Sequence, residues 1–550
     1  MKNIKYCCHF VLFYCFTTTT LIAQNWLWAK DGGNTIWAGT THVTVNANSN
    51  IYCLGGFVDS VTFDNTTYHG WADMQGGNGF IAQYNPSGNF VNVGRISKGN
   101  MQSGFSTGSL NHDAEGNIYV TGDMSGSNSF DTIFTGANYN GYLAKFDSNL
   151  NGKSVKLAAD IVYASAFDSE KNTYLAGAID KIVSHIDTFT LYNSSANPAF
   201  HPKMFLAKFD SDGKCLWVKQ SYGATCSIAS LSLSQGNLYL MGSADSCLQF
   251  DTTHICGNNG SGTDFIINAD LDGNVKWVLT PGNAGGTYVH SLTSDANGNC
   301  YVTGGFNQSI ILGNDTLQKI PGSKSNAFLV KYDSTGSALW AKQLNSDSII
   351  YGTSQSSDGV GATYIFGKFI RSAIFENDTI ESLLNNNMFI ARYGPNGDYL
   401  GHKIISNVLG TSIAQDADGN AIVTGNLSTG TTYFDSIPLT CTGQSNFFLA
   451  KLEAITGASN SVRMMRLDDR LVIYANPNTG SFTIEVPQGI VRGNRAQLGI
   501  YNSTGGMVKD EMVDISNNRL SIDIGSVQKG IYSVTLSSGQ KRYTGRVIIN

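Results

Sequence analysis

The residues that could perform chemistry are few and scattered along the chain. GFSTG at Gly104–Gly108 matches the GxSxG pattern, but a nucleophile elbow needs a strand, a sharp turn and a helix in sequence. This segment is rich in turn formers and leads into a predicted strand, so we interpret the match as chance. The histidines occur singly, without HExxH or HxH spacing. They are therefore expected in loops or on the surface.

Paired carboxylates recur in two short motifs, DSDG (Asp210, Asp212) and DADGN (Asp416, Asp418). They could bind calcium, but an EF-type loop also needs a glutamate at a fixed distal position, which the sequence lacks. In a tight turn, aspartate bonds back to the backbone and glycine accepts a positive φ. We therefore favour turns and keep calcium as the only cofactor considered, since no Cys/His spacing suits zinc.

Aromatic residues and one insert are further candidates. Four tryptophans recur at one repeat position: Trp28, Trp217, Trp277 and Trp340. This recurrence favours a core role over a sugar-binding platform. Trp71, in a variable hairpin, could serve either role. The insert around His185–Lys203, with HIDTF and FHPK, is a weak active-site candidate.

These residues belong to a repeat that dominates the chain and must position them. SDANGNCYVTGGF, a variable hairpin and NAFLVKYDSTGSALWAKQL form one copy, ending at Leu344. Related copies recur every 55–67 residues, as measured at Tyr52, Tyr119, Tyr174, Tyr239, Tyr301, Tyr364 and Ile422. A period of this length is typical of solenoids and propellers.

Each copy contains four short alternating runs separated by Gly, Asp and Asn turns, which predicts a four-stranded antiparallel sheet. Alternation in FLAKFD places Phe205, Ala207 and Phe209 on one face and Leu206 on the other. The last copy lacks its aromatic fourth strand, and WLWAK at Trp26–Lys30 would supply it. We predict an all-β seven-bladed β-propeller, closed by the N-terminal strand and followed by a small β-sandwich.

Composition agrees with this fold class. Charged residues make up 14% of the chain, which contains 61 glycines, a balance that favours strands and turns. The net charge is −6, and no basic stripe indicates nucleic acid binding. No segment after the N-terminus has the roughly 18 apolar residues of a membrane-spanning helix.

The N-terminus has two lysines, an apolar run and then LIAQ, the order found in a secretory signal. We predict a signal peptide over 1–23, a propeller over 24–457, a linker over 458–469 and a C-terminal domain over 470–550. Seven cysteines remain after cleavage. A hairpin turning at Asp251–Thr252 would place Cys247 opposite Cys256, so a disulfide is possible there.

The repeat resembles the bacterial β-propeller repeat family called SBBP over roughly residues 25–457. This resemblance implies an extracellular propeller and no defined activity, because fold does not determine function.

The C-terminal stretch resembles the type A sorting domain of type IX secretion in Bacteroidota. The matches occur in YANPNTG, YNSTGGMV, KGIYSV and a basic end, and the residues concerned are Pro477, Asn478, Gly480, Gly505, Gly506, Gly530, Tyr532, Lys541 and Arg542. The resemblance implies recognition by the outer-membrane export machinery, usually followed by removal of the domain and often by attachment to surface lipopolysaccharide. A plain β-sandwich used for adhesion is the alternative.

Two classes of function fit these patterns. The first is a secreted or cell-surface, non-enzymatic binding or scaffold protein, adhesin-like, whose partner is an extracellular protein or glycan. The second is an extracellular hydrolase or lyase with an active site on one propeller face. An enzyme should break the repeat by clustering Asp, Glu, His or Arg in adjacent loops. Because such clustering is weak, we favour the binding protein.

Overall fold

A computed structural model describes residues 25–33, 37–70, 78–98, 104–126, 128–135, 140–257, 261–281, 286–359, 361–376, 378–382, 384–456, 471–486, 490, 495–502, 507–525, 527–538 and 541–550. These residues form strands, turns and a short 3-10 helix at Pro198–Phe200, so the protein is all-β. The predicted signal peptide (1–23) and linker (458–469) lie outside them. The chain divides into a large part, 1–379 with 383–461, and a C-terminal part, 462–550 with 380–382.

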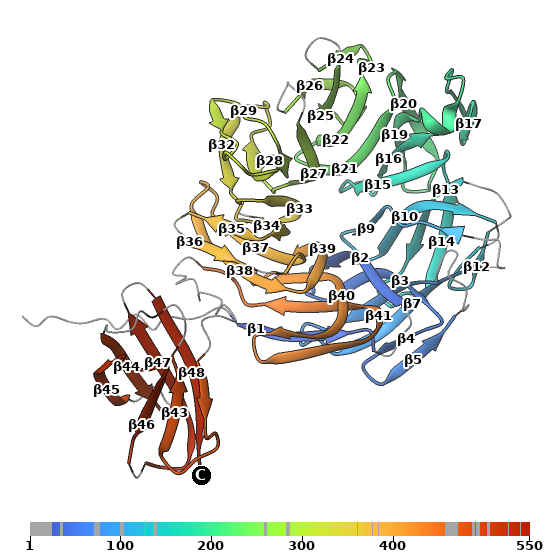
Figure 1. Cartoon of the computed structure of the whole chain (residues 1–550). Coiled ribbons are helices and arrows are strands. Elements are labelled where there is room, and N and C mark those ends of the chain that lie inside the picture. Colours follow the sequence, from blue (N-terminus) through green and yellow to red (C-terminus); the bar gives the residue numbers. More distant parts are fainter. Residues whose placement is uncertain are drawn as a thin grey trace, which may run out of the picture. The chain divides into compact units, whose positions relative to one another are not determined.

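The described strands of the large part pair mostly antiparallel, and we divide them by the sequence copies into repeats 1 to 7 (Figure 1). The strands of repeats 1 and 7 belong to one ten-stranded sheet. Repeat 1 contains β2 (Trp37–Val45), β3 (Ile51–Val58), β6 (Asn78–Tyr84) and β7 (Phe90–Lys98). Repeat 2 contains β8 (Gly104–Phe105), β9 (Ser109–His112), β10 (Ile118–Ser125), β13 (Asn140–Phe146) and β14 (Gly152–Leu157). Repeat 3 contains β15 (Ile161–Phe167), β16 (Thr173–Ile179), β19 (Lys203–Phe209) and β20 (Cys215–Gly223).

The remaining repeats follow the same order. Repeat 4 contains β21 (Cys226–Ser234), β22 (Asn237–Ser246), β25 (Ser261–Ala269) and β26 (Val275–Leu279). Repeat 5 contains β27 (Thr287–Ser294), β28 (Cys300–Phe306), β31 (Asn326–Tyr332) and β32 (Ala338–Leu344). Repeat 6 contains β33 (Ile349–Ser357), β34 (Thr363–Ile370), β37 (Asn387–Tyr393) and β38 (Tyr399–Ser406). Repeat 7 contains β39 (Val408–Gln415), β40 (Ala421–Phe434) and β41 (Ile437–Leu452), with β1 (Trp26–Asp31) paired antiparallel to β41.

Short hairpins connect the second and third strands of most repeats. They are β4 (Ser60–Phe63) with β5 (Thr66–His69), β11 (Asn128–Phe130) with β12 (Ile133–Phe134), β17 (Val183–Ile186) with β18 (Phe189–Tyr192), β23 (Leu248–Phe250) with β24 (Thr253–Ile255), β29 (Ile310–Leu312) with β30 (Asp315–Leu317), and β35 (Ser372–Phe375) with β36 (Asp378–Glu381). We call these the side hairpins. They coincide with the sequence segments that vary most between copies.

Each sheet is buried on both faces, as β19 illustrates. Phe205, Ala207 and Phe209 pack into one apolar cluster with Tyr119 of repeat 2. Leu206, on the opposite face, packs into another cluster with residues of repeat 4. The predicted alternation is therefore confirmed, and its physical reason is that neighbouring repeats cover both faces of the sheet.

The first strands of successive repeats lie beside one another in chain order, and β39 of repeat 7 lies beside β2 of repeat 1. At this last contact, the Val43 amide donates to Ser412 Oγ at 3.2 Å. The hydroxyls of Thr40 and Thr424 lie 2.6 Å apart and are buried. The start and the end of the large part are thus joined by direct contacts.

The recurring tryptophans also connect repeats, each packing on a turn glycine of the next repeat. The glycines concerned are Gly88, Gly273, Gly336 and Gly397, which contact Trp28, Trp217, Trp277 and Trp340 respectively. Their φ values lie between +78° and +86°, and an added Cβ would lie 2.5 to 3.1 Å from the indole. Only glycine accepts both this backbone and this close approach. The Trp28 contact joins the N-terminal strand to repeat 1.

Aspartates in the turns hold the backbone, as the sequence predicts. Asp295 Oδ1 accepts the amides of Asn297 and Asn299 at 3.0 Å, and Oδ2 accepts the Tyr301 hydroxyl at 2.9 Å. Burial alone would raise the pKa of Asp295, but these hydrogen bonds outweigh it and lower the pKa below its usual range. A similar balance lowers the pKa of Asp147 to about 2.

Stability should therefore fall in acid. A carboxyl whose pKa is lower in the folded chain than the roughly 3.9 of an unfolded aspartate contributes stability above that value and loses it as the pH falls toward the folded pKa. Denaturant midpoints measured at pH 7, 4 and 3 should decrease in that order. Replacing Asp295→Asn should lower the midpoint at pH 7 and reduce its dependence on pH. Equal midpoints at pH 7 and pH 3 would contradict this account.

The C-terminal part is a pair of antiparallel sheets. One contains β42 (Val472–Tyr474), β43 (Ser481–Glu485) and β46 (Arg519–Asp523), and the other contains β44 (Arg495–Tyr501), β45 (Met507–Asp514), β47 (Gly530–Ser538) and β48 (Lys541–Ile549). Both sheets contribute to one apolar cluster, with Ile484 and Ile522 from the first and Leu498 and Val534 from the second. This shared core makes the part a small β-sandwich.

Candidate functional site

The loop between β42 and β43 holds the last strand of the chain. Asn476 Oδ1 accepts the Ile548 amide at 2.7 Å. The Asn478 amide donates to the Ile548 carbonyl at 2.9 Å, and the Asn478 carbonyl accepts the Asn550 amide at 2.9 Å. The loop that contains the predicted sorting residues therefore fixes the position of the chain's C-terminal end.

Other predicted sorting residues support the same loop and sheet. Pro477 lies within the loop, and Gly480, at φ +115°, donates its amide to Asn478 Oδ1 at 2.7 Å. Tyr532 is buried and donates its hydroxyl to the Gln528 carbonyl at 2.5 Å, while Gly530 begins β47.

The remaining predicted residues are not gathered at this loop. Lys541 and Arg542 begin β48, opposite Ser538 and Ser537 of β47. Gly505 and Gly506 lie outside the described residues. The structure thus brings together Pro477, Asn478 and Gly480, and it places Gly530, Tyr532, Lys541 and Arg542 on the paired strands β47 and β48.

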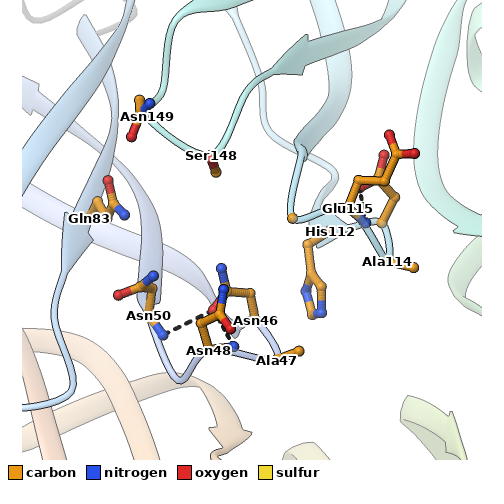
Figure 2. Close-up of a pocket in the computed structure, with 12 residues that line it drawn as sticks. Asn46, Ala47, Asn48, Asn50, Gln83, His112, Ala114, Glu115, Ser148 and Asn149 are labelled. Atoms are coloured by element: carbon orange, nitrogen blue, oxygen red, sulfur yellow. Dashed lines mark hydrogen bonds between the residues drawn. The ribbon is translucent and has the colours of Figure 1, made fainter.

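A polar cleft of about 370 Å³ lies between repeats 1 and 2 (Figure 2). Three turns and the strands β6 and β9 border it, and its lining residues are Asn46, Ala47, Asn48, Asn50, Gln83, His112, Asp113, Ala114, Glu115, Gly116, Ser148 and Asn149. Sequence reasoning did not select these residues. The available signal was that repeat 1 has Asn46 and Gln83 where every other copy except the fourth has a carboxylate and a cation.

Few charged groups border this cleft. Burial lowers the pKa of His112, and the Asp113 carboxylate offsets only part of this, so the imidazole is neutral at pH 7. Its Nδ1 lies 3.0 Å from Thr44 Oγ1. Lys171 lies 2.5 Å from the Glu115 carboxylate, an ion pair on the surface. The cleft can therefore exchange hydrogen bonds, and the charged groups among its lining residues are the Asp113 and Glu115 carboxylates.

The carboxylates considered for calcium are already engaged. Asp210 Oδ1 accepts the amides of Asp212 and Lys214 at 3.1 and 2.8 Å. Asp416 Oδ2 lies 2.7 Å from Lys451 Nζ in a buried ion pair, and Asp416 Oδ1 accepts the Asp418 amide at 3.0 Å. Among the described residues, no three His, Cys, Asp or Glu side chains gather as a metal site. These positions act as turn formers.

The GxSxG match does not lie in an elbow. Gly104–Phe105 is strand β8, and the next element after Ser106 is strand β9; both pair with β10. Ser106 Oγ donates to Asp123 Oδ1. The strand-turn-helix context of an α/β nucleophile is therefore not formed by these described residues.

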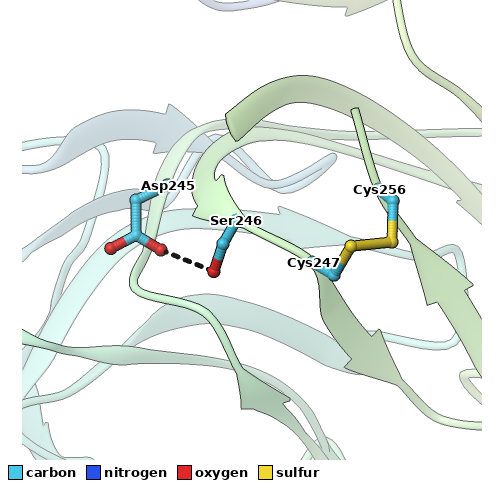
Figure 3. Close-up of a disulfide and its surroundings, with 4 residues drawn as sticks. All are labelled: Asp245, Ser246, Cys247 and Cys256. Atoms are coloured by element: carbon cyan, nitrogen blue, oxygen red, sulfur yellow. Dashed lines mark hydrogen bonds between the residues drawn. A yellow bond between two sulfur atoms is a disulfide. The ribbon is translucent and has the colours of Figure 1, made fainter. Parts of the chain in front are cut away.

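The structure contains a disulfide between Cys247 and Cys256, with Cα atoms 4.3 Å apart (Figure 3). The side hairpin β23–β24 pairs Phe250 with Thr253, which brings the two cysteines opposite each other. Among the described residues, five other cysteines are buried and free: Cys53, Cys215, Cys226, Cys300 and Cys441.

Thiol counting tests this pairing. The mature chain, alkylated in denaturant without reductant, should label at five cysteines, and at seven after reduction. The double variant Cys247→Ala/Cys256→Ala should lose about 2–3 kcal/mol of stability, as expected for closing a short loop. The single variant Cys441→Ala is the control and should leave the disulfide intact. Seven labelled thiols without reductant would contradict the pairing.

Comparison with known families identifies the C-terminal part. Residues 472–550 match the family described as a secretion system C-terminal sorting domain. This match supports type IX secretion as found in Bacteroidota, so the chain is an exported protein directed to the cell surface or the medium. A search of curated proteins finds no match. Within the described residues, no helix is long and apolar enough to cross a bilayer.

Solved structures are similar at low identity. A puromycin hydrolase shares 9% identity over 82% of this chain and 58% of its own, with a TM-score of 0.40, so our chain spans less than two thirds of it. A member of the duf4221 family from Bacteroides vulgatus shares 11% sequence identity over 64% of this chain and 93% of its own, with a TM-score of 0.31. A Synechocystis apocarotenoid oxygenase shares 9% sequence identity over 78% of this chain and 94% of its own, with a TM-score of 0.33. These similarities identify neither an activity nor a ligand.

Proposed function

We propose that the chain is a secreted or cell-surface binding protein without enzymatic activity, built on a closed seven-bladed β-propeller of the SBBP type over residues 24–457. The contacts of β39 with β2 and the pairing of β1 with β41 support the closed ring. A signal peptide over 1–23 would direct the first export step. The sorting domain over 470–550 would engage the type IX machinery in the second.

Exposed apolar side chains on the side hairpins and nearby loops carry the binding proposal. Phe134 on β12, Tyr192 on β18 and Ile311 on β29 are more than half exposed, and Phe200 beside β19 is 75% exposed. Aromatic and large apolar residues are the usual anchors of protein interfaces. Because the hairpins vary in sequence while the strands repeat, the variable surface is the part suited to a specific partner. We propose an extracellular protein or glycan as that partner, in an adhesin-like role.

A paired screen tests this function. The full mature chain is applied to a glycan array and to immobilised extracellular proteins, and in parallel to a panel of glycosidase, lyase and protease substrates. We expect retention of a ligand without turnover, and weaker retention when Tyr192→Ser and Phe200→Ser are combined. Turnover of any substrate would instead favour the alternative, a hydrolase or lyase with its active site on a propeller face. If the double variant bound its ligand as well as the native chain, the proposal that the side hairpins form the binding surface would be wrong.

A further inference from the structure

Repeat 1 lacks a charged pair that is present in repeats 5, 6 and 7; repeat 4 lacks it as well, with Asn268 opposite Tyr239 on its third strand. In repeat 5, Lys331 lies 3.5 Å from the turn carboxylate Asp295, and both are buried. In repeat 7, Lys451 lies 2.7 Å from Asp416, and repeat 6 uses Arg392 with Asp358 at 3.2 Å. These cations occupy the third strand: Lys331 is opposite Tyr301, Arg392 is opposite Tyr364, and Lys451 is opposite Ile422.

The same two positions in repeat 1 carry neutral amides. Gln83 lies opposite Tyr52 on the third strand, and Asn46 takes the place of the turn carboxylate, accepting the amides of Asn48 and Asn50 at 3.0 Å. Both Gln83 and Asn46 are more than nine-tenths buried. A shorter, uncharged pair therefore stands in repeat 1 where a long cation and a carboxylate fill the space in repeats 5, 6 and 7. The cleft lies at this position.

The Gln83 side chain retains unused hydrogen-bonding capacity. Its Nε2 donates to the Tyr52 hydroxyl at 3.2 Å, and Tyr52 donates to the Ser148 carbonyl at 3.0 Å. Gln83 Oε1 is buried and accepts no hydrogen bond from the described residues. A buried amide oxygen without a partner is costly, and Gln83 is one of the residues that line the cleft.

The cleft is larger and more open than a site for one water. Asn48 and Asn149 are exposed at its rim, and Asn50 and Ser148 also line it (Figure 2). Its volume of about 370 Å³ falls at the small end of ligand sites, which span roughly 300–1,000 Å³. The lining includes only two apolar side chains, Ala47 and Ala114.

We propose that this cleft binds a neutral saccharide of one or two rings. Sugar hydroxyls both donate and accept hydrogen bonds, so they match walls of asparagine and glutamine amides, a serine hydroxyl and a neutral histidine. An anionic ligand finds no cation among the lining residues. The Asp113 carboxylate already accepts the amides of Glu115 and Asn117 and the Tyr119 hydroxyl, so it has little hydrogen-bonding capacity left for a cationic ligand. A peptide would need apolar pockets or a free strand edge, whereas turns form most of the border.

This site goes beyond the proposed function and is independent of what the side hairpins bind. Both the cleft and the hairpins could serve one surface protein, but each is tested by different variants.

Restoring the repeat pair tests the site. The double variant Asn46→Asp/Gln83→Lys recreates the arrangement of Asp416 and Lys451 and should fill the cleft. The full mature chain is titrated by calorimetry with maltose, cellobiose and N,N′-diacetylchitobiose, and with a glucuronic acid disaccharide as the charged comparator. We expect the native chain to bind at least one neutral disaccharide, and the double variant to bind it at least tenfold more weakly.

A second pair of variants covers the case in which the buried change prevents folding. Asn48→Ala/Asn149→Ala removes two exposed rim amides and should also weaken binding at least tenfold. Asn297→Ala is the matched control, because Asn297 is the exposed counterpart of Asn48 in the repeat 5 turn, and it should bind like the native chain.

Three outcomes would overturn the inference. They are no binding of any neutral saccharide, binding of the glucuronic acid disaccharide alone, and neutral binding that the rim variants leave unchanged. The last would place saccharide binding elsewhere and leave the proposed binding function standing. Hydrolysis of the disaccharide by the native chain would contradict the proposed function but not the location of the site, provided the rim variants lose it.

Discussion

A chain that ends at Gly457 should accumulate in the periplasm of a Bacteroidota host with type IX secretion, while the full chain reaches the surface or the medium. The match over residues 472–550 and the anchoring of the last strand by Asn476 and Asn478 place the export determinant in the removed part. Because the large part has its own apolar cores, the truncated protein should remain folded. We expect essentially complete loss of export, measured by fractionation and immunoblotting.

Two controls separate export from folding. Protease resistance of the periplasmic product should match that of the full chain. Asn478→Ala, which removes the side-chain acceptor of the Gly480 amide, should reduce export only partly, since the Asn478 backbone bonds to Ile548 and Asn550 remain. Normal release of the truncated chain would refute the role of the sorting domain.

Removal of residues 24–30 should strongly destabilise the large part. This segment contains most of β1, which supplies the fourth strand of repeat 7 and covers the edge of β41. Trp26 is 5% exposed and packs edge-on against Phe434 at 5.0 Å between ring centres. Loss of the strand exposes that edge and empties the Trp26 site. The substitution Trp26→Ala alone should cost about 3–5 kcal/mol.

Urea unfolding measures both changes. Leu27→Ala is the matched control, because Leu27 lies on the same strand with 49% exposure, and it should shift stability by less than about 0.5 kcal/mol. A deletion variant with the native midpoint would mean that β1 does not hold the ring together.

Much of the architecture could be predicted because the strands and turns are locally encoded. Turn aspartates and glycines mark the strand ends, and the alternation of Phe205 and Leu206 identifies two buried faces. The displaced strand at Trp26–Lys30 was also visible, since repeat 7 lacks its own aromatic strand. The tandem copies made these patterns stronger than any single copy would.

The cleft could not be predicted with the same ease. Asn46 and Ser148 come from turns far apart in the sequence and His112 ends strand β9, and only the packing of repeat 1 against repeat 2 brings them together. The tryptophans were predicted as core, yet Trp28 and Trp277 are half-buried and lie on turn glycines of the next repeat. Contacts between repeats depend on how the sheets pack, which periodicity alone does not specify.

Cross-linking of the closing strand tests the central claim, a ring closed by its N-terminal strand, most directly. Ala29 lies opposite Ala450 in the pairing of β1 with β41, so Ala29→Cys/Ala450→Cys should form a disulfide in the full chain, detected by peptide mass mapping. The matched pair Ala29→Cys/Ala391→Cys, with Ala391 on β37 of repeat 6, should not. A ring closed by the N-terminal strand predicts a cross-link between residues 29 and 450 and none between residues 29 and 391. No cross-link there, or equal cross-linking in both pairs, would contradict the account.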